Sequence, residues 1–162
     1  MSYEYSEDGL IEHATQDVLQ ELGWTVLTAW QNESFGEDGL LGRENKSEVI
    51  LSRYLLRALE KLNPNLPKTA YEQAIEQLSQ KVADKTLGRI NKEKNELLKN
   101  GVPVSFTNDK GELVKKKLKV FNFKDYTDNH FLAVRQLEVV GELYNRRPDV
   151  VGFVNGIPLV FF

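Results

Sequence analysis

The sequence predicts an α/β fold, in which a mixed twisted sheet of about five strands is flanked by helices. Apolar residues recur at helical spacing from Leu10 to Leu22 and through residues 47–100. From Val102 onward the apolar period becomes two, which is typical of strands. Asn155-Gly156 lies between two short apolar runs and is a strong signal for a two-residue hairpin turn. Together these patterns predict a sheet with an α-helical insertion at about residues 47–100.

Start and stop residues delimit the expected helices. Ser6 can cap the first helix, which should pack on the sheet, and Gly23 can end it. A second helix is expected from Ser47 to Leu62, where Asn63-Pro64 ends it. The third should follow Pro67 and reach Leu78, and the fourth should run roughly from Lys85 to Asn100, with Gly101 as its terminator.

The expected strands are short and rich in aromatic and β-branched residues. Residues 32–45 are loop-like, without either period. The chain ends in an apolar run, so we expect a sequence cut off within a strand. The expected strands are residues 24–29, 104–107 paired with 113–123 around a turn at 108–111, 130–140, and 147–154 paired with 157–162.

Composition narrows the function classes. The chain has 162 residues, of which 41% are hydrophobic and 28% charged, within the range of one soluble domain. The absence of cysteine excludes disulfides, thiolate zinc sites and a cysteine nucleophile, and fits a cytoplasmic protein. No apolar run is long enough to cross a membrane. A net charge of -3 does not by itself suggest nucleic-acid binding, but it is compatible with a metal-dependent nuclease.

The segment from Arg147 to Val160 carries the most specific motif. Pro148-Asp149 begins one apolar strand, and Asn155-Gly156 leads into the next. This pattern resembles the PD-(D/E)xK nuclease motif in the form found in R (restriction) subunits of type I restriction enzymes. Further stretches resemble that family in order and spacing over nearly the full length: residues 12–24, 62–67, 129–136 and 153–159.

The resemblance implies a restriction-endonuclease-like fold and a Mg²⁺ site. Asp149 would be a catalytic metal ligand, and the first helix would contribute a further acid, Glu12. Carboxylate oxygens suit Mg²⁺, which polarises the phosphate and helps to generate the attacking hydroxide. As alternatives, Asp149 is a solvated aspartate and Glu12 an exposed glutamate on an amphipathic helix. Glu7 is a weaker choice for the same role as Glu12.

In the family, the strand after the hairpin ends in an acid, one spacer and a lysine. This half of the motif is expected directly after Phe162. We therefore expect residues 1–162 to be a single PD-(D/E)xK nuclease-like domain, truncated before the acid-x-Lys half of the motif. We also expect weak or absent Mg²⁺ binding and no cleavage by the fragment itself.

Basic residues are candidates for contacts with DNA phosphates. Lys115, Lys117 and Lys119 alternate along one strand, so their ammonium groups should project together. Such a run can equally protect an edge strand from pairing with other chains. Arg146 and Arg147 are closer to Asp149 along the chain, and Arg147 has the alternative of pairing with a nearby acid.

Several other polar and aromatic residues are open to two interpretations. Glu138 and Gln136 either belong to the wall of the site or lie on a solvated face. Tyr71, Tyr126 and Tyr144 are interpreted as packing residues rather than stacking platforms.

The resemblance also implies partners outside this chain. Double-stranded DNA would be the substrate, and modification and specificity subunits would complete the complex. ATP would serve motor domains elsewhere, because no Walker-type loop occurs here. One alternative is a non-catalytic assembly or DNA-docking module on a nuclease scaffold. Another is a nuclease of the same fold from a different system.

Overall fold

The computed structural model describes residues 7–81, 86–141 and 143–161, without the side chains of residues 7–12. The chain divides into two compact units. The first unit takes residues 1–49, 130–154 and 158–162, and the second takes residues 50–129 and 155–157. That residues 1–162 form a single nuclease-like domain stays a prediction.

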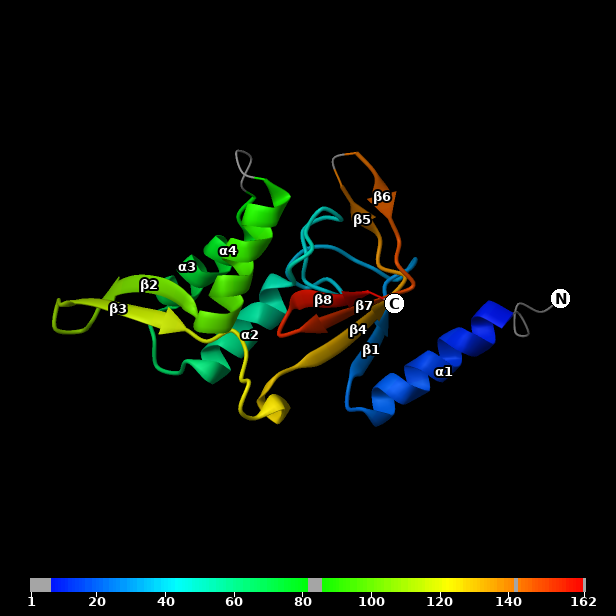
Figure 1. Cartoon of the computed structure of the whole chain (residues 1–162), viewed down its shortest axis with the longest axis horizontal. Helices are drawn as coiled ribbons and strands as arrows, with labels where there is room; N and C mark the ends of the chain where they lie inside the picture. Colours follow the sequence, from blue (N-terminus) through cyan, green and yellow to red (C-terminus); the bar gives the residue numbers. More distant parts are fainter. Residues whose placement is uncertain (1–6, 82–85, 142, 162) are drawn as a thin grey trace. The chain divides into compact units, whose positions relative to one another are not determined.

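A four-stranded mixed sheet is the main β structure, and it confirms the predicted α/β fold (Figure 1). Its order is β1-β4-β7-β8, with β1 parallel to β4 and β4 antiparallel to β7. About five strands were expected, but this sheet has four in the described residues, because residues 102–118 form a separate hairpin. The strands are β1 (Thr25–Thr28), β4 (Phe131–Arg135), β7 (Val150–Val154) and β8 (Ile157–Phe161).

The first helix, α1 (Glu7–Glu21), leads into β1 and confirms the predicted element. Of its expected apolar stripe, Leu19 is buried against Ala133 and Val150, whereas Val18 and Leu22 are exposed. The helix ends before Gly23, whose φ of 85° favours glycine, as predicted. The proposed cap, Ser6, lies outside the described residues.

The second unit contains the three helices and the first hairpin of the sequence prediction. Its core is apolar and joins α2 and α3 to β2. The predicted α-helical insertion is thus confirmed for the described residues between 52 and 100. The elements are α2 (Ser52–Leu62), α3 (Lys68–Ser79), α4 (Leu87–Asn100), β2 (Val102–Thr107) and β3 (Leu113–Leu118).

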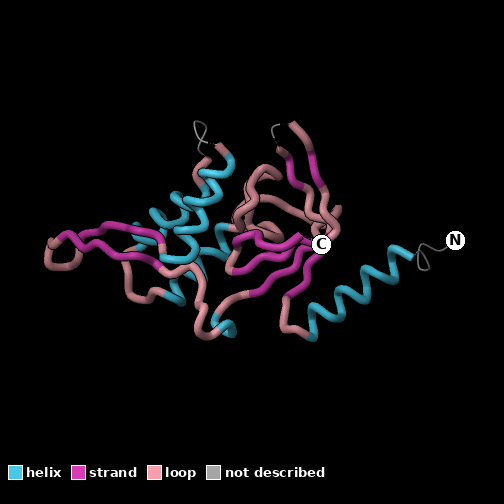
Figure 2. Tube along the Cα trace, viewed as in Figure 1, coloured by secondary structure: helices cyan, strands magenta, loops and turns pink. Residues whose placement is uncertain are grey.

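Helix α2 begins at Ser52 rather than at Ser47, which corrects the sequence prediction. The preceding residues use their polar groups in a loop: Ser47 N–H donates to the side chain of Asn45, and Glu44 N–H donates to the carboxylate of Glu48. These local bonds compete with the helical hydrogen bonds. The same residues belong to the long loop between β1 and α2, which Figure 2 shows without regular structure.

The expected strand over residues 130–140 is interrupted at Gln136. This residue has a φ of 52°, in the left-handed region that a continuing strand cannot adopt. The chain resumes as β5 (Val139–Val140), which pairs with β6 (Asn145–Arg146) in a separate two-stranded sheet. The interruption therefore places a sharp bend directly after β4.

The turn at Asn155-Gly156 confirms the second predicted hairpin. Both residues have positive φ, 50° and 80°, as a two-residue hairpin turn requires. Leu51 N–H donates to the carbonyl of Gly156, and a Cβ at Gly156 would lie 2.5 Å from the carbonyl oxygen of Leu51. Glycine is therefore needed here both for its conformation and for the close approach of a second backbone segment.

Candidate functional site

Asp149 lies directly before β7, and its side chain is exposed. Its carbonyl oxygen accepts a hydrogen bond of 2.8 Å from the backbone N–H of Gln136, the residue at the bend after β4. The next residue, Val150, pairs with Arg135 in the ladder between β4 and β7. The backbone at Asp149 is thus fixed on one side by the ladder and by the bend.

The hairpin brings a second strand end to the same edge of the sheet. β7 and β8 are neighbours, and a two-residue connection can only join antiparallel strands. The end of β8 at Phe161 therefore lies at the edge where Asp149 begins β7.

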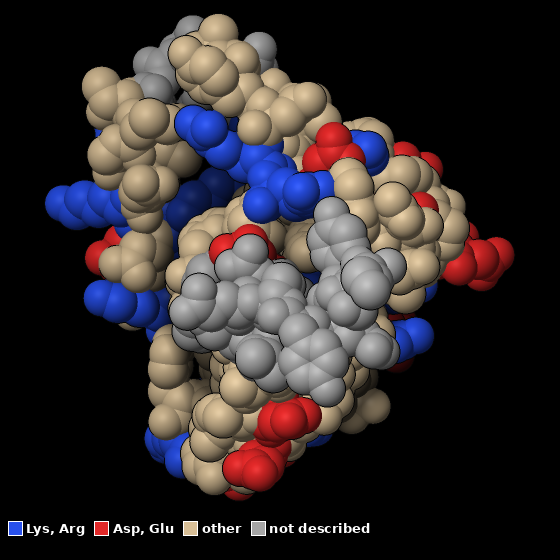
Figure 3. All heavy atoms as spheres, turned by 90° about the vertical axis from the view of Figure 1, so that its right-hand side faces the viewer, with Lys and Arg blue, Asp and Glu red and all other residues tan. Residues whose placement is uncertain are grey.

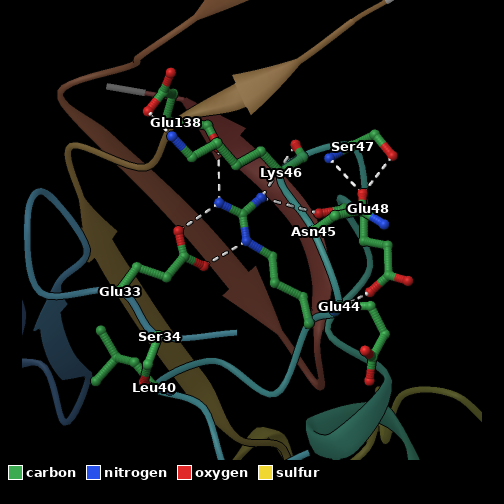
Figure 4. Close-up of polar contacts among 10 residues, drawn as sticks. Glu33, Ser34, Leu40, Glu44, Asn45, Lys46, Ser47, Glu48 and Glu138 are labelled. Carbon is green, nitrogen blue, oxygen red and sulfur yellow. Dashed lines mark hydrogen bonds and ion pairs between the residues drawn. The ribbon is translucent and has the colours of Figure 1, made fainter. Parts of the chain in front are cut away.

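A buried arginine, Arg43, contacts the segment that follows the bend at Gln136. Arg43 is 1% exposed, and its guanidinium binds both carboxylate oxygens of Glu33, with 2.7 Å between Nη2 and Oε2. The same Nη2 donates to the carbonyl of Glu138 at 2.7 Å, and Nη1 donates to the carbonyls of Lys46 and Glu48 (Figure 4). One side chain therefore connects three segments of the first unit. We call Arg43 and Glu33 the Arg43 hub.

Lys46 and Glu138 add a second link between the same segments. Lys46 Nζ binds the carboxylate of Glu138 at 2.5 Å, and Val140 N–H donates to the carbonyl of Lys46 at 3.0 Å. The sequence left two interpretations of Glu138 open, a residue in the wall of the site or a residue on a solvated face. In the structure it is a half-exposed acid whose charge Lys46 neutralises, and it borders the cavity described next.

A cavity of about 150 Å³ lies beside this bend. Gln136 lines this cavity, and its backbone N–H also donates to the carbonyl of Asp149. The cavity and Asp149 are therefore connected through one residue. The wall consists of Ala29, Trp30, Gln31, Glu33, Phe35, Lys46, Gln136 and Glu138.

The two predicted arginines are exposed and stack on aromatic rings. The Arg147 guanidinium lies 3.8 Å from the centre of the Trp30 ring, and the Arg146 guanidinium lies 5.3 Å from that of Tyr144. No ion pair of either arginine is found among the described residues, and the acid-pairing alternative for Arg147 stays open. In Figure 3, Lys and Arg side chains form a group above the centre of the face, with acidic side chains around it.

The predicted lysines belong to the second unit. Lys115 and Lys117 are exposed on β3, and Lys119 follows its end. Ser105 on β2 is the ladder partner of Lys115. Its N–H and its carbonyl both bind the side-chain amide of Gln73, which lies on α3. The backbone groups of Ser105 therefore point away from β3, and those of Lys115 point to the open side of β3. This geometry agrees with the edge-protection alternative, and a role of these lysines in DNA binding stays a prediction.

The tyrosine interpretation needs correction. Tyr71 is buried and packs in the core of the second unit, as expected. Tyr126 and Tyr144 are 72% and 67% exposed, so the packing interpretation is wrong for them. Tyr126 lies in the one-turn 3-10 helix η2 (Tyr126–Asp128), and Tyr144 lies between two-residue strands. Elements of this length offer little apolar surface to cover a ring.

Trp30 was not identified from the sequence, although it lines the cavity and carries the Arg147 stack. A signal was present, because Trp30 stands between the expected strand at residues 24–29 and the loop-like residues 32–45. Loops carry a large share of binding residues, and tryptophan is enriched at interfaces.

The donor atoms around Asp149 fit a hard cation only in part. Its exposed carboxylate is a suitable oxygen ligand. Among the described residues, no group of three or more His, Cys, Asp or Glu side chains is placed to hold a metal ion. The side chains of Glu12 and Glu7 lie outside the described residues, so their predicted roles stay predictions.

Comparison with known proteins identifies the family. The model of the family described as "Type I restriction enzyme R protein N terminus" matches residues 4–162. The type I restriction enzyme HindI endonuclease subunit of Haemophilus influenzae is 34% identical over 158 residues, which cover 94% of this chain and 14% of that protein. A type I restriction enzyme MjaIXP endonuclease subunit of Methanocaldococcus jannaschii, whose name is provisional, is 31% identical over 97% of this chain and 15% of that protein.

This chain thus spans about one seventh of the length of the curated relatives that it matches. None of its described helices is both long and apolar enough to span a membrane. The match over residues 4–162, together with the mixed sheet that positions Pro148-Asp149 at the start of β7, shows that the chain belongs to the type I restriction enzyme R protein N-terminus family.

Proposed function

We propose that this chain is the DNA-cleaving domain of a type I restriction enzyme R subunit, and that it hydrolyses phosphodiester bonds of double-stranded DNA with Mg²⁺. The single observation that carries the proposal is the position of Asp149. It is exposed at the start of β7, at the edge to which the hairpin returns the end of β8. Family membership supports the same conclusion, since the relatives carry the name of endonuclease subunits.

In this proposal Asp149 would hold Mg²⁺ through a carboxylate oxygen. The bound metal would polarise the scissile phosphate and lower the pKa of the attacking water. The exposure of Asp149 leaves room for waters and a phosphate oxygen in the remaining coordination positions. Arg146 and Arg147, three and two positions before Asp149, would bind the DNA backbone. Glu12 would contribute a further acid from α1.

Within residues 1–162 the motif supplies one strand carboxylate and no acid-x-Lys sequence after β8. Mg²⁺ normally requires more than one carboxylate, or a phosphate in addition. We therefore expect these 162 residues by themselves to bind Mg²⁺ weakly and not to cleave DNA. The acid and the lysine would follow Phe162.

The partners belong to the proposal as well. Cleavage would take place in a cytoplasmic complex with modification and specificity subunits, and ATP would drive motor domains outside this chain. Sequence recognition would then lie with the specificity subunit, which agrees with the acidic net charge of -3.

The test is plasmid cleavage by the R subunit that carries this chain, assembled with its partners, ATP and Mg²⁺. We expect Asp149→Asn to abolish cleavage while ATP hydrolysis and the melting temperature stay unchanged, because the side chain is exposed. Asp109→Asn, at an exposed position in the β2–β3 turn, is the matched control and should cleave normally. Undiminished cleavage by Asp149→Asn would contradict the proposal.

The second candidate is a non-catalytic assembly or DNA-docking module. The observation in its favour is the lack of a three-ligand acidic cluster among the described residues. The coding sequence after Phe162 discriminates between the two candidates. An acid-x-Lys sequence at that point supports the nuclease, and its absence together with unaffected Asp149→Asn cleavage supports the scaffold.

A further inference from the structure

We propose that the cavity beside Gln136 binds one unpaired nucleobase of a DNA strand whose backbone runs past Arg147. The identity of the ligand as DNA rests on the proposed function. The inference adds to it a specific site, formed by Trp30, Phe35, Gln31 and Gln136, and a preference for single-stranded over duplex DNA. We call these four residues and their cavity the base pocket.

The size of the base pocket suits one planar heterocycle. Its volume of about 150 Å³ corresponds to about five water molecules at ~30 Å³ each. Sites for larger organic ligands have volumes of about 300–1,000 Å³. The pocket is therefore large enough for a single ring system and too small for a dinucleotide.

The aromatic residues in the wall of the base pocket are suited to stacking. Trp30 and Phe35 are each 40% exposed, although both belong to a loop held by the buried Arg43 hub. Aromatic rings stack on the faces of bases of any sequence. In a duplex the neighbouring base pairs cover these faces, so a base reaches a ring in a cavity only after leaving the stack.

Arg147 provides a cation beside the base pocket that could bind a DNA phosphate. Arg147 stacks on Trp30 at 3.8 Å, and a guanidinium that stacks through its face keeps its N–H donors at the edge. No carboxylate partner for Arg147 is found in the described parts of the chain. A base near Trp30 and a phosphate at Arg147 would use both parts of this arrangement.

The backbone of the base pocket is an independent observation. Four non-glycine residues of the described chain have positive φ, and two of them, Gln31 (58°) and Gln136 (52°), line this cavity. Glutamine is not among the residues that favour this conformation, and such outliers concentrate at functional sites. Gln136 also donates its N–H to Asp149, so the base pocket and the proposed metal ligand share one backbone segment.

The direct test is binding of a fluorescein-labelled twelve-nucleotide oligo(dT) to this chain in EDTA, measured by anisotropy beside a duplex of equal length. We expect the single strand to bind more tightly than the duplex and to quench tryptophan fluorescence. Trp30→Ala should weaken binding about 5- to 150-fold, the range for loss of one base stack. Trp30→Phe should keep most of the affinity but lose the quenching, because Trp24 would be the remaining tryptophan.

Arg147→Gln should weaken binding and reduce the slope of log affinity against log salt by about 0.7, the value for one phosphate contact on a single strand. Tyr126→Ala and Arg89→Gln, at exposed positions of the second unit, are the aromatic and charge controls and should bind as wild type. Circular dichroism of each variant checks folding, and Phe35→Ala provides an independent probe of the same pocket.

Equal affinity of Trp30→Ala and wild type, or a duplex affinity equal to that of the single strand, would overturn the proposal. Because the assay contains no divalent metal, its outcome is separate from cleavage. If Asp149→Asn abolishes cleavage but Trp30→Ala binds oligo(dT) as wild type does, the base-pocket proposal is contradicted and the nuclease proposal is supported. If oligo(dT) binding depends on Trp30 but the full subunit does not cleave DNA, the base-pocket proposal is supported and the nuclease proposal is contradicted.

Discussion

The long loop after β1 in the first unit and the helical core of the second unit are stabilised by different kinds of interaction. The interior of the second unit is apolar, with Leu55, Leu59 and Ala70 fully buried among its helices. In the first unit, the long loop after β1 is organised by a buried ion pair, in which the Arg43 hub binds three backbone carbonyls. Apolar packing is non-directional, whereas hydrogen bonds fix positions and angles. The directional hydrogen bonds of the Arg43 hub lie close to Asp149, whose position the proposed metal site requires to be fixed.

Removal of Arg43 should have the largest effect on stability. Arg43→Met leaves the Glu33 carboxylate, 7% exposed, without its partner, and it removes the donor from three carbonyls. We expect a loss of about 3–5 kcal/mol in the free energy of unfolding, measured with urea. Amide hydrogen exchange should rise first in residues 43–48 and 136–140.

The double variant Arg43→Met, Glu33→Leu is the matched control, because it removes both charges. It should recover part of the lost free energy, because it removes the unpaired Glu33 charge but leaves three carbonyls without the Arg43 donor. A loss below 1 kcal/mol for Arg43→Met alone would show that the loop does not depend on this ion pair.

Truncation in the apolar core should rank second. Leu59 is fully buried in α2, so Leu59→Ala leaves a cavity and should cost about 2–5 kcal/mol. Leu87→Ala, at a position that is 79% exposed, should change stability little. Exchange should increase in α2 and α3 before it does in β4 and β7. A simultaneous increase in all four elements would show that the two regions open as one cooperative unit.

Buried side-chain amides in the second unit should have a smaller effect. Asn63 donates to the carbonyls of Leu59 and Lys119 and accepts from Lys119 N–H at 2.8 Å. We expect Asn63→Ala to cost about 1–3 kcal/mol, because these backbone groups lose a partner. Asn100→Ala, which removes one exposed contact to Glu96, is the control and should be nearly neutral. Equal effects of the two variants would contradict the assigned role of Asn63.

Regular patterns in the sequence predicted the elements but not the interactions between distant residues. The hairpin at Asn155-Gly156, the start of α3 after Pro67 and the end of α4 before Gly101 follow from local chemistry, namely positive φ, proline and glycine. The position of Asp149 before β7 follows from the same hairpin. These features depend on neighbours along the chain, so a single sequence is sufficient to predict them.

The rest of the site depends on contacts between residues far apart in the chain. Arg43 binds the carbonyl of Glu138, 95 positions away, and no periodic pattern marks either residue. The bend at Gln136 was missed because glutamine has no preference for positive φ, so strand pairing and hydrogen bonds impose it. Trp30 was missed for a related reason, since its partner Arg147 comes from a distant segment.

The smallest expected effect concerns an exposed charge in the second unit. Asp125 caps the helix η2, and hydrogen bonds from the side chain and the backbone N–H of Thr127 hold the pKa of its carboxyl below the ordinary value. A lowered folded-state pKa means a stabilising contribution that is present above the ordinary pKa and is lost as pH falls through the lowered one.

Thr127→Val removes the side-chain donor, so the Asp125 pKa should rise, measured by NMR titration of its carboxyl carbon. Since Asp125 is exposed, the stability at neutral pH should hardly change, in contrast to the loss expected for Arg43→Met. An unchanged Asp125 pKa in Thr127→Val would instead assign the shift to the backbone N–H.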